Sequence, residues 1–356
     1  MALDSSSVGQ KLKNESQSTP SRISGFTVRV ILLMLITGVF ISIGNVNIGA
    51  VGQGISYSLV GVAVFLTLRV LNFPDLTIDG AFPIGGAVCA MLILSGNSPE
   101  VSVIGAFIAG AVTGMVTALI HVFFKIEGLL ASIIVITGAY TITLRIMEGK
   151  SNLPLIGEET LISRHTKEFR TWMIEQFGEE MRRQSNNLLE IMIFGVIVVL
   201  VLSILYLFLR TETGLAIRAT GKNPQMVTAM GLNQNAMIVI GLMISNGLAG
   251  LAGSLAVQQL GFADVNLGVG LIIRGLAAVI IGEVLLRPKS IGQMLIAGAV
   301  GMLVFDISRA WVFAALGLPS TDIRLVSALV VLGALGAPNL HDRWKVWRKK
   351  QQREVA

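Results

Sequence analysis

Charged residues are scarce in this sequence. Asp, Glu, Lys and Arg make up 13% of its 356 residues, whereas roughly a quarter of the residues in a soluble domain are charged. Hydrophobic residues reach 53%. The single cysteine, Cys89, excludes a disulfide bond within the chain. This balance excludes an ordinary soluble domain and indicates a protein whose surroundings are largely the membrane.

The sequence also lacks the usual signatures of catalysis. Its three histidines, His121, His165 and His341, are scattered and form no metal-ligand pattern. Gly214 and Gly221-Lys222 stand too far apart for a phosphate-binding loop, and Asn223 follows where Ser or Thr is needed. No Ser-His-Asp pattern is visible. We therefore expect no catalytic residue, no metal and no cofactor, and any ATP hydrolysis must occur in another subunit.

Long apolar runs recur from about residue 26 to residue 337, and many approach the ~20 residues that a helix needs to cross the bilayer. Their length favours helices over barrel strands, which would alternate in segments of about ten residues. We predict an all-α membrane protein with about ten transmembrane helices. The predicted spans are 26–44, 50–71, 79–96, 101–124, 129–147, 188–209, 235–260, 267–286, 290–311 and 320–337.

Basic residues predict that both termini lie in the cytoplasm. With the N-terminus inside, the inner segments are rich in Lys and Arg, whereas the main outer loop, 148–186, is near neutral. This bias explains the net charge of +6, so we expect membrane lipid and no nucleic acid as a partner. The predicted parts are a disordered tail (1–25), a transmembrane domain (26–337) and a basic tail (338–356).

The two halves of the chain resemble each other. Residues 51–88 align with 240–277 at an offset of 189, and 12 of the 38 pairs are identical, including Phe73 with Phe262 and Asp75 with Asp264. An offset of about five spans turns the second half upside down, which predicts inverted-topology repeats over about 26–147 and 188–337. Shared Gly, Ala and Leu content is the alternative explanation.

Polar residues interrupt the apolar runs at matched places in the two halves. The interruptions are "NFPDLTIDGAFPIGG" (72–86), with Asp75 and Asp79, and "GFADVNLGVG" (261–270), with Asp264 and Asn266; Arg274 follows in the next apolar run. Polar groups at membrane depth mostly line a cavity or a path, so these five residues are candidates for a translocation path. In the alternative, both segments are surface loops whose aspartates cap helices.

Two further charge patterns have structural interpretations. Asp306 and Arg309 are three apart, so we expect them to pair along one helix face. In the outer loop, residues 163–185 alternate aromatic and charged side chains near helical spacing. We expect an amphipathic helix there that lies on the membrane surface, with docking of a partner as the alternative.

The segment "TETGLAIRATGKNPQMVTAMGLN" (211–233) is polar and basic although apolar runs flank it. It resembles the cytoplasmic coupling segment of ABC importer permeases of the ribose and branched-chain amino acid type. The matching residues and their neighbours, which we take as candidates for ATPase coupling, are Gly214, Arg218, Ala219, Gly221, Lys222, Asn223, Pro224 and Gly231. The residues at 221–224, Gly-Lys-Asn-Pro, predict a turn, and 225–230 are compatible with a helix. An ordinary basic loop is the alternative. "FPDLTIDGAFPIGGAV" (73–88) looks like the entry to the third span of the same family, closest to the tryptophan/tyrosine-type uptake permeases.

This resemblance implies the membrane subunit of an importer in a bacterial inner membrane. Its implied partners are cytoplasmic ABC ATPase subunits, a periplasmic or lipid-anchored solute-binding protein and a second copy of the permease. The implied solute is small and amino-acid-like, with an aromatic one among the candidates. An ion- or proton-coupled secondary transporter is the alternative, because such proteins also use inverted repeats and broken helices.

Overall fold

The computed structural model describes residues 48–177 and 185–317 and a few short pieces near the ends: 25–27, 29–30, 322, 325, 327–329 and 331–332. The predicted tail 338–356, nearly all of the tail 1–25, and most of the predicted spans 26–44 and 320–337 lie outside the described residues.

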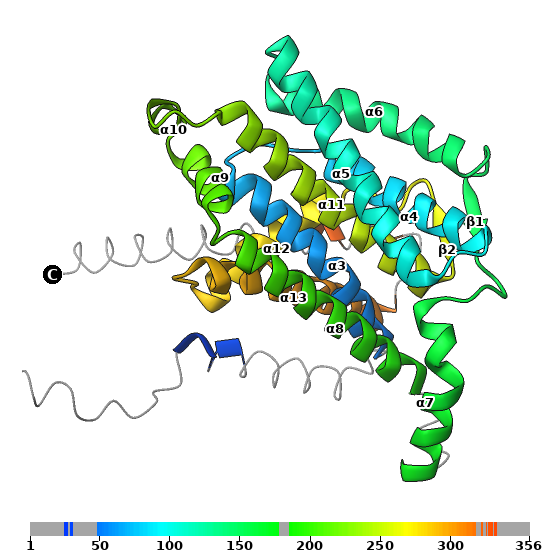
Figure 1. The fold of residues 1–356 in the computed structure, drawn as a ribbon. Helices are drawn as coiled ribbons and strands as arrows, with labels where there is room; N and C mark the ends of the chain where they lie inside the picture. Colours follow the sequence, from blue (N-terminus) through cyan, green and yellow to red (C-terminus); the bar gives the residue numbers. More distant parts are fainter. Residues whose placement is uncertain are drawn as a thin grey trace, which may run out of the picture.

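The described part is a bundle of helices with one very small sheet (Figure 1). Its elements are α3 (Gly49–Phe65), the π-helical turn η1 (Leu66–Val70), α4 (Ile78–Leu94), α5 (Pro99–Phe124), α6 (Gly128–Ile146), β1 (Asn152–Pro154), α7 (Leu161–Phe177), α8 (Ser185–Phe208), α9 (Glu212–Lys222), α10 (Pro224–Ala229), α11 (Gln234–Leu260), β2 (Phe262–Asp264), α12 (Leu271–Leu286) and α13 (Ile291–Leu316).

Six of these helical segments are long and apolar enough to cross a membrane. They are α3 with η1, α5, α6, α8, α11 and α13, and each coincides with a predicted span. Two further predicted spans, 79–96 and 267–286, are the shorter helices α4, with 17 residues, and α12, with 16. The chain is therefore an all-α membrane protein, while the predicted total of ten spans stays a prediction.

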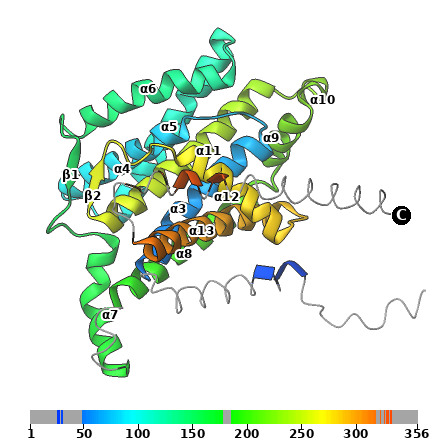
Figure 2. The ribbon, with the colours of Figure 1, turned by 180° about the vertical axis from the view of Figure 1, so that it is seen from behind.

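Helix α11 forms the centre of the bundle and packs against α5, α4 and α3. Helix α3 in turn packs against α13, α12 and α8. The α9–α10 pair lies at one end of the bundle, whereas the β1–β2 pair and α7 lie at the opposite end, as both views show (Figures 1 and 2). The antiparallel pairing of Asn152 with Asp264 joins the loop after α6 to the chain after α11.

Glycine permits the closest helix crossings. At the α5–α11 crossing, a Cβ on Gly110 would lie 3.0 Å from the Cα of Gly250. At the α3–α13 crossing, a Cβ on Gly61 would lie 3.2 Å from the carbonyl carbon of Gly298. Small residues let helix backbones approach in this way within membranes, where hydrophobic burial does not drive helix association.

Helix α7 covers the first part of the segment 163–185, in which an amphipathic helix is predicted. Met173 is buried, whereas Trp172 and Phe177 are exposed, and their ring centroids lie 6.2 Å apart. The helix packs mainly against α8. Its helical state agrees with the sequence pattern over 163–177, and its position on a membrane surface stays a prediction.

Candidate functional site

The segment 211–233 folds into two short helices. Thr211 caps α9 by accepting a hydrogen bond from Gly214 N at 3.3 Å. Asn223 ends α9, where its N–H donates to Ala219 O at 2.8 Å, and begins α10, where its Oδ1 accepts from Met226 N at 3.1 Å. Pro224 follows in the first turn of α10, where a missing N–H costs nothing. The turn predicted at 221–224 is present, but helix α9 before it was not predicted.

A glycine lies at or just beyond the end of each of the two helices. Gly231 leaves α10 with φ of 80°, a conformation that favours glycine. A Cβ on Gly221 would overlap the carbonyl oxygen of Val70, so α9 rests directly on the backbone of η1. Any movement of α9 would therefore press on the end of α3.

Four apolar side chains of this segment are exposed among polar ones. Leu215, Met226, Met230 and Leu232 are all exposed, and Met230 keeps 67% of its surface accessible. Among the predicted coupling residues, Lys222 is exposed and Arg218 is half-buried. The sequence-based prediction included these basic residues and missed the exposed apolar ones. The helical spacing of Met226 and Met230, which are four residues apart, was a signal that could have identified them.

Asp75 is buried at the start of α4, with 1% of its surface exposed. Its Oδ1 accepts from Thr77 N at 2.8 Å, and its Oδ2 accepts from Asn246 Nδ2 of α11 at 2.7 Å. The alternative of a surface loop is wrong for Asp75, because α11 covers it. Its hydrogen bond to Thr77 N stabilises the residues just before α4, so Asp75 does have part of the helix-capping role that the alternative gave it.

Asp264 repeats the local geometry of Asp75 in a more open place. Its Oδ1 accepts from Asn266 N at 2.7 Å, two residues ahead, as Asp75 does with Thr77. Its Oδ2 accepts from Asn152 Nδ2 at 3.4 Å, across the β1–β2 pair. Asp264 is half-buried and Asn266 is exposed.

Asp79 belongs to α4 but caps a different helix. Its two carboxylate oxygens accept from Gly270 N at 3.0 Å and from Ile272 N at 2.6 Å. These N–H groups belong to the first turn of α12, where the helix dipole also favours a negative charge. Gly268 permits this contact, because a Cβ there would overlap the backbone oxygen of Asp79.

Arg274 lies one turn into α12 and joins the predicted Asp306–Arg309 pair of α13. Its NH2 donates to Asp306 Oδ1 at 2.6 Å, and Arg309 Nε lies 3.4 Å from the same oxygen. The guanidinium of Arg274 also stacks over the ring of Tyr57, 4.7 Å from its centroid. The structure thus confirms the expected pairing on α13 and adds Arg274 to it.

The predicted path residues do not all meet in one site. Asp75 lies between α4 and α11, Asp264 and Asn266 lie by the β1–β2 pair, and Arg274 lies between α12 and α13, with Asp79 bridging α4 to α12. Asn246, which completes the Asp75 contact, was missed. An asparagine within the apolar run of α11 is a detectable signal.

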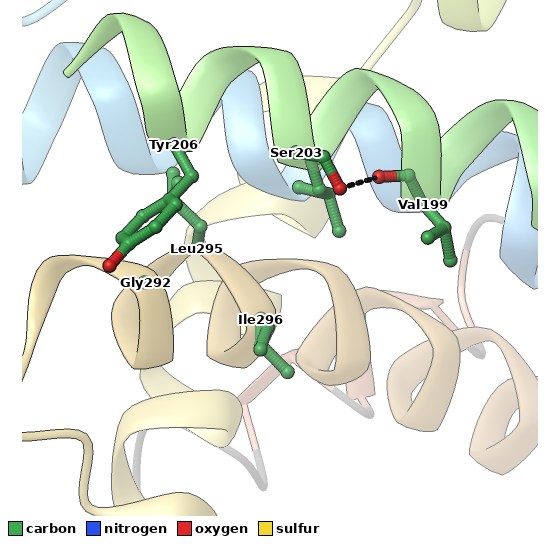
Figure 3. Close-up of a pocket in the computed structure, with 7 residues that line it drawn as sticks. Val199, Ser203, Tyr206, Gly292, Leu295 and Ile296 are labelled. Carbon is green, nitrogen blue, oxygen red and sulfur yellow. Dashed lines mark hydrogen bonds between the residues drawn. The ribbon is translucent and has the colours of Figure 1, made fainter. Parts of the chain in front are cut away.

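A cavity of about 350 Å³ lies between α8 and α13, away from all of these residues (Figure 3). Its lining is mostly apolar, with Leu295 and Ile296 on one side and Tyr206 on the other. Two hydroxyl groups, those of Ser203 and Tyr206, lie on the α8 side of the lining. The hydroxyl of Ser203 donates to Val199 O at 2.7 Å. The cavity therefore suits hydrocarbon better than a polar solute.

Comparison with known proteins identifies relatives over most of the chain. Residues 46–335 match the family described as branched-chain amino acid transport system permease components. A tyrosine transport system permease protein of Clostridioides difficile is 34% identical over 295 residues, covering 83% of this chain and 92% of that protein. An uncharacterised protein of Rickettsia prowazekii is 28% identical and covers 84% of this chain and 99% of its own length.

A shorter match covers about a third of the chain. An autoinducer 2 import system permease protein of Photorhabdus laumondii is 30% identical over 113 residues, which cover 31% of this chain and 34% of that protein. No solved structure matches this chain.

Proposed function

Because this chain belongs to the family of branched-chain amino acid transport system permease components, it is a membrane-spanning permease subunit of an ABC importer, and we propose that it carries a small amino-acid-like solute into a bacterial cell. The solute class rests on the C. difficile relative, whose name gives tyrosine. ATP hydrolysis is assigned to partner subunits, since the sequence has no phosphate-binding loop of its own.

The proposed coupling element is the α9–α10 pair. The observation that carries it is the exposure of four apolar side chains, Leu215, Met226, Met230 and Leu232, on an otherwise polar segment; we call them the coupling face. Exposed apolar patches rimmed by polar residues mark interaction sites. An ATPase that covers this face would push on η1 through the contact between Gly221 and Val70.

The proposed orientation places α9–α10 in the cytoplasm and β1–β2 outside, with both termini inside and the chain in the inner membrane. The ends of the bundle support it, because α9 carries Arg218 and Lys222 and the α12–α13 turn carries Arg287 and Lys289 at the same end as η1. A solute-binding protein would dock at the opposite end. A second copy of the permease would complete the path.

The proposed inverted repeats are supported by helix packing. Helix α3 packs against α12 and α13, and α11, which aligns with α3, packs against α4 and α5 in the same way. The aspartates Asp75 and Asp264 make the same bond to the residue two ahead. In this proposal the two halves move against each other, and Asp75, Asp79, Asp264, Asn266 and Arg274 shape the path between them.

The alternative of an ion-coupled secondary transporter has less support. Two of the relatives are named as permease proteins of a transport system and of an import system. The exposed apolar side chains of the α9–α10 segment also fit a partner subunit, which the importer supplies as its ATPase. We therefore retain the importer alone.

The test is uptake of labelled tyrosine into proteoliposomes that contain the complex purified from its host membrane together with its solute-binding protein. We expect uptake to require ATP on the ATPase side and to be insensitive to ion gradients. Uptake driven by a gradient without ATP would refute the importer.

Met230→Glu tests the coupling face in the same purified complex, with the content of ATPase subunits as the readout. We expect loss of the ATPase from the purified complex, because a charge replaces an apolar contact. The matched control is Ile156→Glu, at the opposite end, where Ile156 is 90% exposed and no ATPase would reach it. Equal ATPase content in both variants would contradict the assignment of α9–α10.

A further inference from the structure

The cluster between α12 and α13 carries more positive than negative charge. In the described part of the chain, the ion pairs of Arg274 and Arg309 both end on Asp306. Asp306 is 1% exposed, and both guanidinium groups are largely buried. Two cations and one anion therefore stand together inside a transmembrane bundle.

The hydrogen bonding of this cluster is incomplete. Both guanidinium groups approach the same oxygen, Asp306 Oδ1, and Asp306 Oδ2 has no partner among the described residues. Within the same part of the chain, the Nε atoms of Arg274 and Arg309 also lack a hydrogen bond. Arg309 NH2 donates to Gln53 Oε1 of α3 at 3.2 Å, which fixes its direction without neutralising it.

An uncompensated charge is costly at this depth. A buried ion pair that is purely structural is expected to balance its charges and satisfy its donors, because each unpaired buried charge carries a desolvation penalty of several kcal/mol. Charged side chains within transmembrane segments whose charge is not balanced tend to mark substrate or ion pathways. Among its ion-paired groups the cluster thus has one positive charge and two Nε–H donors left for an anionic group. Asp79, which caps α12, is the next acidic group that interacts with Arg274.

We propose that Arg274 and Arg309 bind the carboxylate group of the transported solute, and that Asp306 is a positioning residue that holds the two guanidinium groups side by side. This inference rests on the proposed function and adds the chemical group that the path recognises. A guanidinium presents two parallel N–H donors that match the two oxygens of a carboxylate. The single excess charge matches one carboxylate.

The aromatic residues beside the cluster fit this assignment. Tyr57 stacks on Arg274 at 4.7 Å and on Phe82 of α4 at 5.3 Å between ring centroids. Both rings are buried, so the carboxylate of a solute bound here would lie beside packed aromatic side chains of α3 and α4. This arrangement suits a solute that has an apolar side chain beside its charged group.

The variant Arg309→Gln separates a binding role from a structural one. It leaves the neutral Arg274–Asp306 pair and removes only the excess charge, so a structural role predicts an unchanged or higher melting temperature and normal uptake. We expect an unchanged melting temperature and a rise in KM for tyrosine uptake of about tenfold or more, the loss typical of one charge-assisted hydrogen bond. Wild-type KM in a stable variant would overturn the proposal.

Two controls accompany this variant in the reconstituted complex. Arg309→Lys keeps the charge but not the paired donors, and we expect a KM between those of the wild type and Arg309→Gln; if Arg309→Gln fails to reach the membrane, a wild-type KM in Arg309→Lys overturns the proposal. Arg210→Gln changes an arginine that stacks on Tyr206 outside the cluster, and we expect wild-type KM.

A free inorganic anion could supply the same charge, so the assay is repeated with chloride replaced by isethionate. We expect no change in wild-type uptake, and a loss would assign the cluster to chloride and refute solute binding. Failure of the wild type to take up tyrosine with ATP would instead refute the proposed function. The two failures are therefore distinguishable.

Discussion

Replacing Gly250 with alanine should loosen the centre of the bundle. A Cβ on Gly250 would lie 3.0 Å from the Cα of Gly110 and would overlap the carbonyl oxygen of Ala106. Ordinary contacts of a Cβ lie between 3.4 and 4 Å. The obstructing atoms belong to the backbone of α5, so no side-chain rotation can relieve the overlap, and α5 and α11 must separate.

The expected magnitude results from two opposing terms. Overpacking of a tight contact costs about 1–3 kcal/mol, and a backbone obstacle places this site toward the upper end of that range. Alanine regains about 0.5–1 kcal/mol over glycine within a helix. The net expectation is a destabilisation of about 1–2 kcal/mol, with separation of α5 from α11 as its structural cause.

Thermal unfolding of the purified permease in detergent measures this effect. Gly195→Ala in α8 is the matched control, because no described atom lies within 4 Å of a Cβ placed there. We expect a lower melting temperature for Gly250→Ala and an unchanged or higher one for Gly195→Ala. Gly61→Ala, at the α3–α13 crossing, should resemble Gly250→Ala. A melting temperature of Gly250→Ala at or above that of Gly195→Ala would refute the packing argument.

Three further predictions concern the polar groups and the orientation. Asp75→Ala should destabilise the bundle by about 2–5 kcal/mol, because it leaves buried donors of Thr77 and Asn246 unpaired; Asp75→Asn should cost less in the same unfolding assay, and equal losses would contradict this account. Asp79→Ala should lower uptake and speed up amide hydrogen exchange in the first turn of α12, because two N–H groups lose their acceptor. An unchanged exchange rate would exclude the capping role. In a Cys89→Ala background, a cysteine at the exposed position 158 should react with an impermeant reagent from outside and one at 222 only from inside, and external labelling at 222 would reverse the proposed orientation.

Much of the helical framework could be predicted from the sequence, because the signal is local. Runs such as 101–124 and 188–209 are long, apolar and almost free of charge, and they became α5 and α8. The turn before α10 was also predictable, since Asn and Pro at 223–224 have strong preferences for a cap and a first helical turn. Helix α9 was not predicted, because its pattern is short and weakly apolar.

The partners of the polar residues could not be predicted, because they come from distant parts of the chain. Asp75 meets Asn246 and Arg274 meets Asp306, and only packing of α4 on α11 and of α12 on α13 brings them together. Spacing along the sequence revealed the Asp306–Arg309 pair alone, since those two lie on one helix. The charge excess of the cluster becomes visible only when all three side chains are placed.

The two polar interruptions, which align with each other in the sequence, also meet in space. Asp79 of the first interruption caps α12, which follows the second, and Gly268, its aligned counterpart, is the residue that admits it. Arg274 begins its contacts one turn further along α12. A shift of α4 would therefore move the start of α12 and, with it, the guanidinium group that we assign to the solute. The two interruptions therefore form one contact region between the halves. Each aspartate there binds backbone N–H groups, and Arg274, whose charge we assign to the solute, lies one helical turn further along α12.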